Sequence, residues 1–277
     1  MDRIVVLRLE ATGCRAEAAL NGVPLLRLAP PVGLPAAGTV TANAVALPVN
    51  EFTLQGLNEL TLTVQPALPG APDDAPLQSE LAERAGTATL QLLLPRVGQR
   101  AHPAHARTLT QLDWAVAAGD AYDAPLVRSQ RVELPIGFPR WRWLDAPVLP
   151  DSPALYAAGL RFLQELASAL MRGDSEPFVQ ATRLRLEELA QAYQRPLADE
   201  VGRLRAALQA WHAAGALQPA LPDAAALRWR RVAGGRLLEA VNVDGAPAWR
   251  FAGVDGAAPR AWPMRLAQID GRFYALR

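Results

Sequence analysis

The sequence predicts two folded modules: an all-β antiparallel sandwich over residues 1–147, followed by an α+β module over residues 152–277. Three observations predict this order. Short aliphatic and β-branched runs, separated by Gly, Pro and Asn, fill the first half and are typical of strands and turns. Helical hydrophobic stripes begin after Asp151-Ser152-Pro153. Gly-containing turns then separate a last series of short strands, which is an α+β order.

The first module begins with a strand and a tight hairpin. Residues 4–9 are rich in aliphatic side chains, and two further strand-like runs flank Asn21-Gly22. Asn-Gly accepts positive φ at both central positions of a type I′ turn, whose twist suits two antiparallel strands. The remaining strands of this module are expected at residues 39–49, 58–64, 87–94, 128–134 and 140–144.

Three helices are expected to open the second module. Ser152 is a suitable N-cap for a helix that has Pro153 at its first position. Apolar side chains then recur at helical spacing in three segments, which begin near Leu155, Phe178 and Val201. A curved antiparallel sheet is expected next, with strands at residues 227–232, 236–243, 248–251, 264–269 and 273–276.

Part of the first module resembles a known family. The segments 20–24, 47–52 and 56–64, which contain Asn21-Gly22 and a Gly-x-Asn-x-Leu strand, are similar to the galactose-binding-like jelly-roll modules attached to many glycosidases. The resemblance covers about residues 20–64 and is made of fold-determining residues. It implies the β-sandwich, and carbohydrate recognition only by analogy between folds.

The end of the chain resembles a second family. Residues 266–277, with Asp270-Gly271-Arg272 followed by an aromatic residue, are similar to the closing hairpin of nuclear-transport-factor-like (SnoaL-like, cystatin-like) folds. This resemblance implies a curved sheet that wraps a long helix and forms a conical pocket. The chain departs from that pattern because no strand is visible between its helices. The aromatic candidates for lining such a pocket are Tyr193, Trp211, Trp229, Trp249 and Tyr274.

Composition limits the classes of function. Hydrophobic residues make up 51% of the chain and charged residues 20%, which is enough apolar material for packed cores. The net charge of +1 argues against binding nucleic acid by bulk electrostatics. Every basic residue is Arg and none is Lys. We favour coding bias as the reason over an arginine surface selected to recognise carboxylates or phosphates.

The sequence predicts no membrane span and a cytoplasmic location. No apolar run approaches the roughly 18 residues that cross a bilayer, and no signal peptide is visible. The single cysteine, Cys14, fits a reducing compartment and is expected to be a small buried side chain on a strand.

Motifs for catalysis, cofactors and metals are missing from the sequence. It contains no Gly-x-Ser-x-Gly elbow, no Walker-type loop and no dinucleotide fingerprint. His102 and His105 are a close pair of metal-competent side chains, but neighbouring residues do not complete a zinc site. We therefore expect no enzyme, no cofactor and no metal.

One candidate partner-binding segment is Arg140-Trp141-Arg142-Trp143. On a strand, both tryptophans would lie on one face and both arginines on the other. We favour a strand with its tryptophans pointing inward. The alternative is a recognition edge, because Trp and Arg are common at interface hot spots.

A second candidate segment is acidic and aromatic, with Asp113, Trp114 and Tyr122. Its spacing does not fit a calcium loop. We expect a surface loop that contacts a partner, and the alternative for Asp113 and Trp114 is a structural role.

These observations favour a non-enzymatic protein that binds another protein. One concrete form is a bacterial immunity or antitoxin protein, which neutralises a toxic effector by covering its active site. The first alternative is an enzyme or small-molecule binder that uses the conical pocket. The second is a carbohydrate-binding module, for which the first module offers few aromatic side chains.

Overall fold

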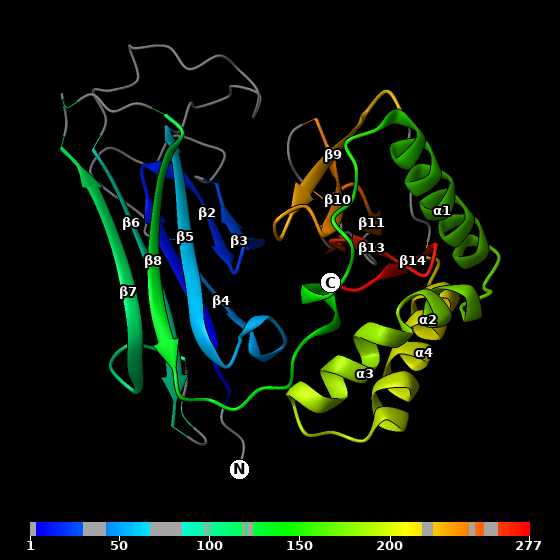
Figure 1. Cartoon of the computed structure of the whole chain (residues 1–277), viewed down its shortest axis with the longest axis horizontal. Helices are drawn as coiled ribbons and strands as arrows, with labels where there is room; N and C mark the ends of the chain where they lie inside the picture. The colour runs from blue at the N-terminus through cyan, green and yellow to red at the C-terminus, as the bar shows by residue number, and fades with distance from the viewer. Residues whose placement is uncertain are drawn as a thin grey trace. The chain divides into compact units, whose positions relative to one another are not determined.

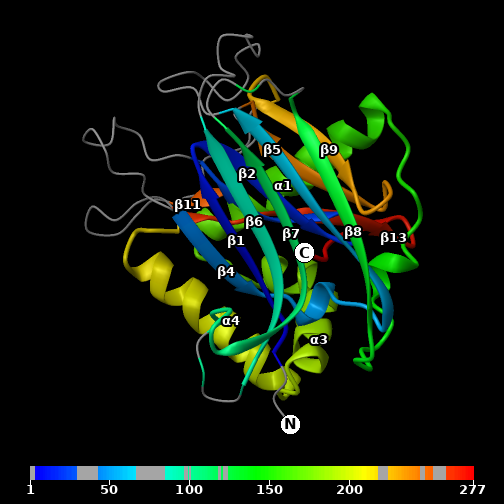
Figure 2. The ribbon, with the colours of Figure 1, turned by 90° about the vertical axis from the view of Figure 1, so that its left-hand side faces the viewer.

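The first sheet has four antiparallel strands in the order β4-β1-β6-β7. The strands are β1 Val6–Thr12, β4 Asn43–Pro48, β6 Gly86–Pro95 and β7 Ala106–Val116. Figure 2 shows them side by side in this order. The computed structural model describes residues 4–29, 43–66, 85–96, 99, 101–117, 120, 124–217, 224–243, 247–251 and 260–277.

The second sheet, also antiparallel, has the order β3-β2-β5-β8. Its strands are β2 Cys14–Leu20, β3 Val23–Leu28, β5 Gly56–Pro66 and β8 Leu126–Leu134. Alternate side chains on β1 and β2 are buried, as expected for strands with one face toward a core. Strands of the two sheets also contact one another, so the buried faces form a common aliphatic core.

The Asn-Gly hairpin between β2 and β3 is confirmed. Asn21 and Gly22 have φ of 54° and 74°, as a type I′ turn requires. The side-chain amide of Asn21 donates to the Oδ1 of Asn58 over 2.9 Å and to the carbonyl of Phe52 over 2.8 Å. Asn58, in turn, holds the loop before β5 by accepting from the N–H of Leu54 at 2.7 Å. The two asparagines therefore join the hairpin to β5.

The acidic, aromatic segment is not a surface loop where the structure describes it. Asp113 and Trp114 lie on β7, which pairs with β6, and Asp113 faces Thr89 across the ladder. The strand was missed because residues 107–113 are mostly polar, with only Leu109 and Leu112 apolar. Such a pattern suits an edge strand whose outer face is solvated. Tyr122 lies outside the described residues.

Four helices follow, where three were expected. They are α1 Pro153–Met171, α2 Glu176–Ala181, α3 Arg183–Ala192 and α4 Leu197–Ala213. The expected cap of α1 is confirmed, because Ser152 Oγ accepts from the N–H of Leu155 at 3.3 Å. The second expected helix is divided at Thr182, whose hydroxyl donates to the carbonyl of Phe178 over 2.8 Å.

An antiparallel sheet in the order β14-β13-β10-β9 completes the chain. Its strands are β9 Leu227–Val232, β10 Leu237–Asn242, β13 Arg265–Ile269 and β14 Arg272–Ala275. A short separate pair joins β11 Arg250–Phe251 to β12 Arg260–Ala261. Asp270 and Gly271, with φ of 50° and 74°, form the predicted turn between β13 and β14.

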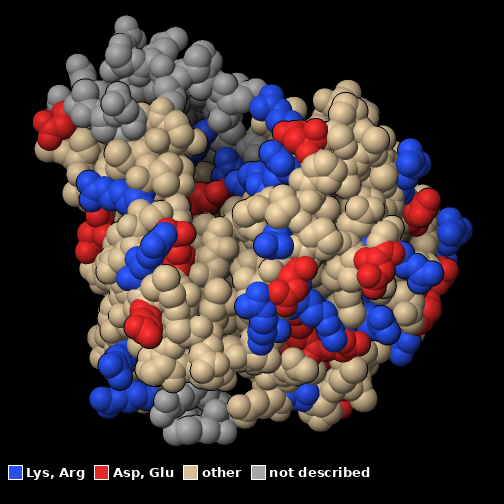
Figure 3. Space-filling model, viewed as in Figure 1, with Lys and Arg blue, Asp and Glu red and all other residues tan. Residues whose placement is uncertain are grey.

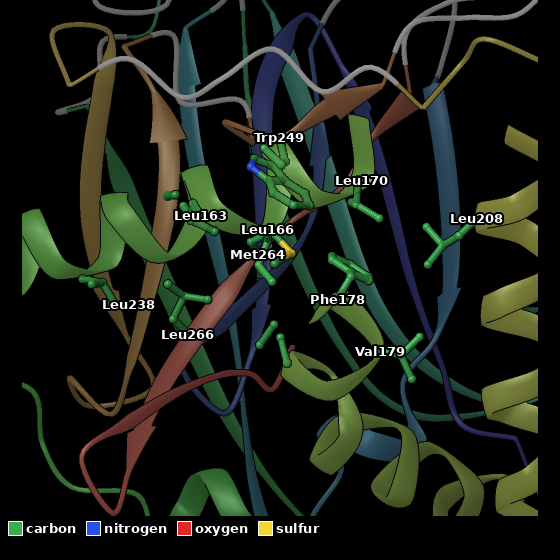
Figure 4. Packing of buried hydrophobic residues seen from close by; sticks show 14 of the residues in the cluster. Leu163, Leu166, Leu170, Phe178, Val179, Leu208, Leu238, Trp249, Met264 and Leu266 are labelled. Atoms are coloured by element: carbon green, nitrogen blue, oxygen red, sulfur yellow. The ribbon is translucent and has the colours of Figure 1, made fainter. Parts of the chain in front are cut away.

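Helix α1 packs against this sheet. Leu163 and Leu166 point toward Leu238 and Leu266 (Figure 4). A Cβ at Gly159 would lie 3.0 Å from the Trp229 ring, so the helix and the sheet approach closely at this glycine. Aromatic rings fill the core beside these leucines. Phe178 stacks on Trp249 at 5.7 Å and meets Trp262 edge-on at 5.1 Å between ring centroids.

The prediction of a strand at residues 140–144 is wrong. Arg142–Leu144 form a short 3₁₀ turn, η3, with the N–H of Leu144 donating to the carbonyl of Trp141. The backbone N–H of Arg142 donates to Glu188 Oε1 on α3 at 2.5 Å. A partner on a helix takes the place of a neighbouring strand, so no ladder forms.

The chain divides into two compact units, Met1–Arg140 and Trp141–Arg277. In its described residues the first unit is built of antiparallel strands, and the second combines helices with antiparallel strands. Residues 141–147, which the sequence analysis assigned to the first module, fall in the second unit. No helix in the described part of the chain is both long and apolar enough to cross a membrane.

Candidate functional site

The candidate site is an open groove of about 940 Å³ in the second unit. Its walls come from α1, from α2 with the start of α3, and from the edge strand β14, which Figure 1 shows beside these helices. The lining residues are Arg161, Phe162, Gln164, Glu165, Leu166, Ser168, Ala169, Arg172, Pro177, Gln180, Ala181, Arg183, Arg272, Phe273 and Tyr274.

One stripe of α1 forms the longest wall. Arg161, Glu165, Ser168 and Arg172 follow one another at spacings of four, three and four positions, which places them on one helix face. Leu163, Leu166 and Leu170 lie on the buried side of the same helix. The core therefore fixes the direction in which the polar stripe faces.

The half-buried rings of Phe162 and Phe273 form the apolar floor of the groove. The rings of Phe162 and Phe273 lie 5.6 Å apart between centroids with a 34° tilt, and Tyr274 follows on β14. Arg161 precedes Phe162 on α1 and Arg272 precedes Phe273 on β14, and both arginines line the groove. The groove thus combines an apolar floor with a cationic rim.

The rim carries more positive than negative charge. Arg161, Arg172, Arg183 and Arg272 are all exposed, and Glu165 is the one carboxylate of the lining. Within the described part of the chain, none of the four guanidinium groups lies within 4.0 Å of a carboxylate oxygen.

Several arginines elsewhere in the second unit have carboxylate partners. Arg205 lies 2.8 Å from Glu176, and Arg142 lies 2.6 Å from Glu187. On the face that Figure 3 shows, basic and acidic side chains are interspersed. In the groove, the four arginines have no carboxylate partner among the described residues.

The structure buries the tryptophans of the Arg140–Trp143 segment. Trp141 is 0% exposed and Trp143 is 2% exposed, while Arg140 and Arg142 are exposed at their surfaces. The guanidinium carbon of Arg277 lies 6.0 Å from the centre of the Trp141 ring. The tryptophans point inward, as the favoured interpretation of the sequence predicted. They do so from a turn and not from a strand, and a partner could reach only the arginines of this segment.

Asp113 and Trp114 also have structural contacts. Trp114 is 4% exposed and packs beside Gly86. The carboxylate of Asp113 accepts from Thr89 at 2.9 Å and from Gln111 at 2.7 Å. These contacts belong to the ladder of β6 and β7.

The five aromatic pocket candidates do not gather around one cavity. Trp249 is 1% exposed within the core, and Trp211 packs against Phe251 and Trp262 at 5.8 and 5.7 Å. The other placements are separate: Trp229 stacks on Tyr156, Tyr193 lies under Arg195, and Tyr274 lines the groove. Of the five, Tyr274 alone is a groove residue.

Metal-binding and nucleophilic groups were also located. Among the residues that the structure describes, no three His, Cys, Asp or Glu side chains are arranged to hold a metal ion. His102 and His105 have ring centroids 6.1 Å apart. Cys14 is buried on β2, as expected, and burial raises the pKa of its thiol to about 11. A thiol with this pKa stays protonated, and so a poor nucleophile, at neutral pH.

Sequence reasoning missed the groove arginines. The spacing of Arg161, Glu165, Ser168 and Arg172 could have been read as one helix face. The approach of β14 to that helix face could not have been predicted, because it depends on the packing of Phe162 against Phe273.

No family model, no curated protein and no solved structure matches the chain. The resemblances to galactose-binding-like modules and to nuclear-transport-factor-like folds therefore stay predictions.

Proposed function

We propose that this protein is a non-enzymatic protein-binding protein whose second unit holds its partner in the groove of α1, α2 and β14. The observation that carries the proposal is the lining of the groove. Arg and aromatic residues are enriched at protein interfaces, and exposed arginines beside half-buried rings are typical of interface hot spots. A pocket for a small molecule is commonly more enclosed and mostly apolar.

The chemistry of the lining supports binding over catalysis. Acid–base catalysis needs a positioned group that exchanges a proton near the working pH. Arginine remains protonated in proteins, and the lining contains no His, Cys or Asp. Glu165 on α1 is exposed on the rim, and the carboxylates of α3, Glu187 and Glu188, pair with Arg142 and Arg277 outside the groove.

A charge-reversal variant tests this function. R161E/R272E changes two exposed groove residues, and R107E/R228E makes the same change in net charge at exposed residues outside the groove. Each tagged protein is purified from the organism that encodes it, and co-eluting proteins are quantified by mass spectrometry. We expect one protein in near-stoichiometric amount with the wild type and with R107E/R228E, and its loss with R161E/R272E.

The narrower form of the proposal is an immunity or antitoxin protein. In that form the co-eluting protein is a toxic enzyme, and adding the purified wild type stops its activity whereas R161E/R272E does not. Absence of any protein enriched over a tag-only control would contradict the protein-binding function in both forms.

A further inference from the structure

We infer that the groove recognises an acidic polypeptide segment that carries an apolar side chain between its carboxylates. This inference rests on the proposed protein-binding function and names the chemistry of the partner. Four arginines face one glutamate in the lining, so an occupant with negative charge complements the rim. Arginine binds carboxylates through two parallel hydrogen bonds, which adds geometric specificity to the charge.

The helix geometry sets the spacing of the carboxylates. Arg161 on α1 and Arg172, the C-cap of that helix, are separated by about 16 Å along the axis, at a rise of about 1.5 Å per residue. An extended segment of about five residues covers this distance, at roughly 3.3 Å per residue. A helical segment needs about eleven residues. Acidic side chains near both ends of either segment would meet the two arginines.

The floor of the groove selects what lies between the carboxylates. Phe162 and Phe273 pack against each other and are half-buried, and Tyr274 lies beside them on β14. An apolar side chain that covers these rings removes their remaining exposed surface from water. This burial stabilises the complex, because apolar surface removed from water favours association.

The same features disfavour a nucleic acid as the occupant. Glu165 lies between Arg161 and Arg172 on the rim and would repel a continuous phosphate chain. The rings of Phe162 and Phe273 contact each other at a 34° tilt and are not stacked platforms for successive bases. The chain as a whole carries a net charge of only +1.

Synthetic probes test the inference. The probe is a fluorescein-labelled peptide of about twelve residues, with Glu at both ends and Leu and Phe between them. A matched peptide has Gln for every Glu, and an oligothymidylate of about twelve nucleotides stands for nucleic acid. Fluorescence anisotropy measures binding at low salt and at about 0.15 M salt.

We expect the Glu peptide to bind at least about tenfold more tightly than the Gln peptide. R161E/R272E should lower the affinity for the Glu peptide at least about tenfold. A second double variant, R172E/R183E, should also lower this affinity, because each charge reversal replaces attraction with repulsion. R107E/R228E should bind like the wild type. Far-ultraviolet circular dichroism checks that each exposed-residue variant is folded.

Equal binding of the two peptides, tighter binding of oligothymidylate, or an unchanged affinity in both groove variants would overturn the inference. The two proposals fail separately. If a protein partner co-purifies equally with wild type and R161E/R272E while no peptide binds, the acidic-segment inference is wrong and the protein-binding function stands. If the Glu peptide binds the groove but no protein co-purifies, the inference stands and the protein-binding function is wrong.

Discussion

The cores of the two units are built from different side chains. In the described residues of the first unit, the core is mainly Leu, Val and Ala on alternating strand positions. In the second unit, rings of Phe178, Trp211, Trp249, Phe251 and Trp262 pack with centroids 5.1–6.0 Å apart. Two facing sheets are filled by many similar small contacts, whereas helices over a short sheet leave irregular space that a few large rings occupy.

The buried polar groups differ in the same way. In the first unit, neutral amides such as Asn58 satisfy backbone groups of the loop before β5. In the second unit, charged groups are buried: Glu188 pairs with Arg277, and Glu239 lies between Arg230 at 2.6 Å and Arg265 at 2.9 Å. Because an unpaired buried charge is costly, the second unit should be the more sensitive to loss of one polar partner.

The largest effect is expected from F178A in the second unit. Phe178 is 0% exposed and contacts Trp249 and Trp262, so its removal leaves a cavity that rigid rings cannot fill. We expect a loss of about 4 kcal/mol in the free energy of unfolding. Urea denaturation followed by tryptophan fluorescence measures it, because Trp114 is the one tryptophan of the seven in the first unit. L197A, at a 41% exposed side chain, is the control and should change little.

The next effect comes from breaking a buried ion pair. E188A removes the partner of Arg277 and the acceptor of the Arg142 N–H, and we expect it to cost about 3 kcal/mol. E176A removes a similar contact, to Arg205, at a fully exposed site, and should lower the free energy of unfolding much less than E188A, because solvent screens the pair. Equal losses in the two variants, measured in the same denaturation experiment, would refute the contrast between the charged core and the surface.

In the first unit, N58A should lower the free energy of unfolding by about 2 kcal/mol. Asn58 is 1% exposed, and its loss leaves the N–H and C=O of Leu54 without their side-chain partners. Hydrogen exchange should show faster exchange near residues 52–59 and unchanged protection in α1. Faster exchange in α1 as well would mean that the two units do not respond separately.

The smallest effect at neutral pH concerns Cys14. Desolvation by burial raises the pKa of this thiol to about 11, although a backbone hydrogen bond from Thr12 opposes the shift. The folded chain therefore holds the proton more tightly than the unfolded chain. Stability from this group is present below the unfolded pKa of about 8.5, and is lost as the pH rises toward about 11.

Alkylation measures this difference. At pH of about 9, we expect the folded protein to react with iodoacetamide roughly fiftyfold or more slowly than the protein in urea, because the thiolate fraction is small and the sulfur is enclosed. The urea sample is the control. Equal rates in the two samples would show that the thiol is neither buried nor shifted in pKa.

Expectations based on a few neighbouring residues were confirmed most often. The Asn21-Gly22 and Asp270-Gly271 turns and the Ser152 cap depend on backbone angles and hydrogen bonds within one turn of chain. The errors came where a distant partner decided the structure. Residues 142–144 form a turn because Arg142 bonds to Glu188, 46 positions away.

The sequence by itself determined the order of a β-rich part and an α+β part, and the type of its tightest turns. These features follow from periodicity and from local backbone preferences. Only the tertiary structure decided which arginines share a groove and which tryptophans are buried. The reason is physical: Arg161 on α1 and Arg272 on β14 line one groove only because the helix packs against the sheet, with Phe162 against Phe273, and such packing depends on the whole core.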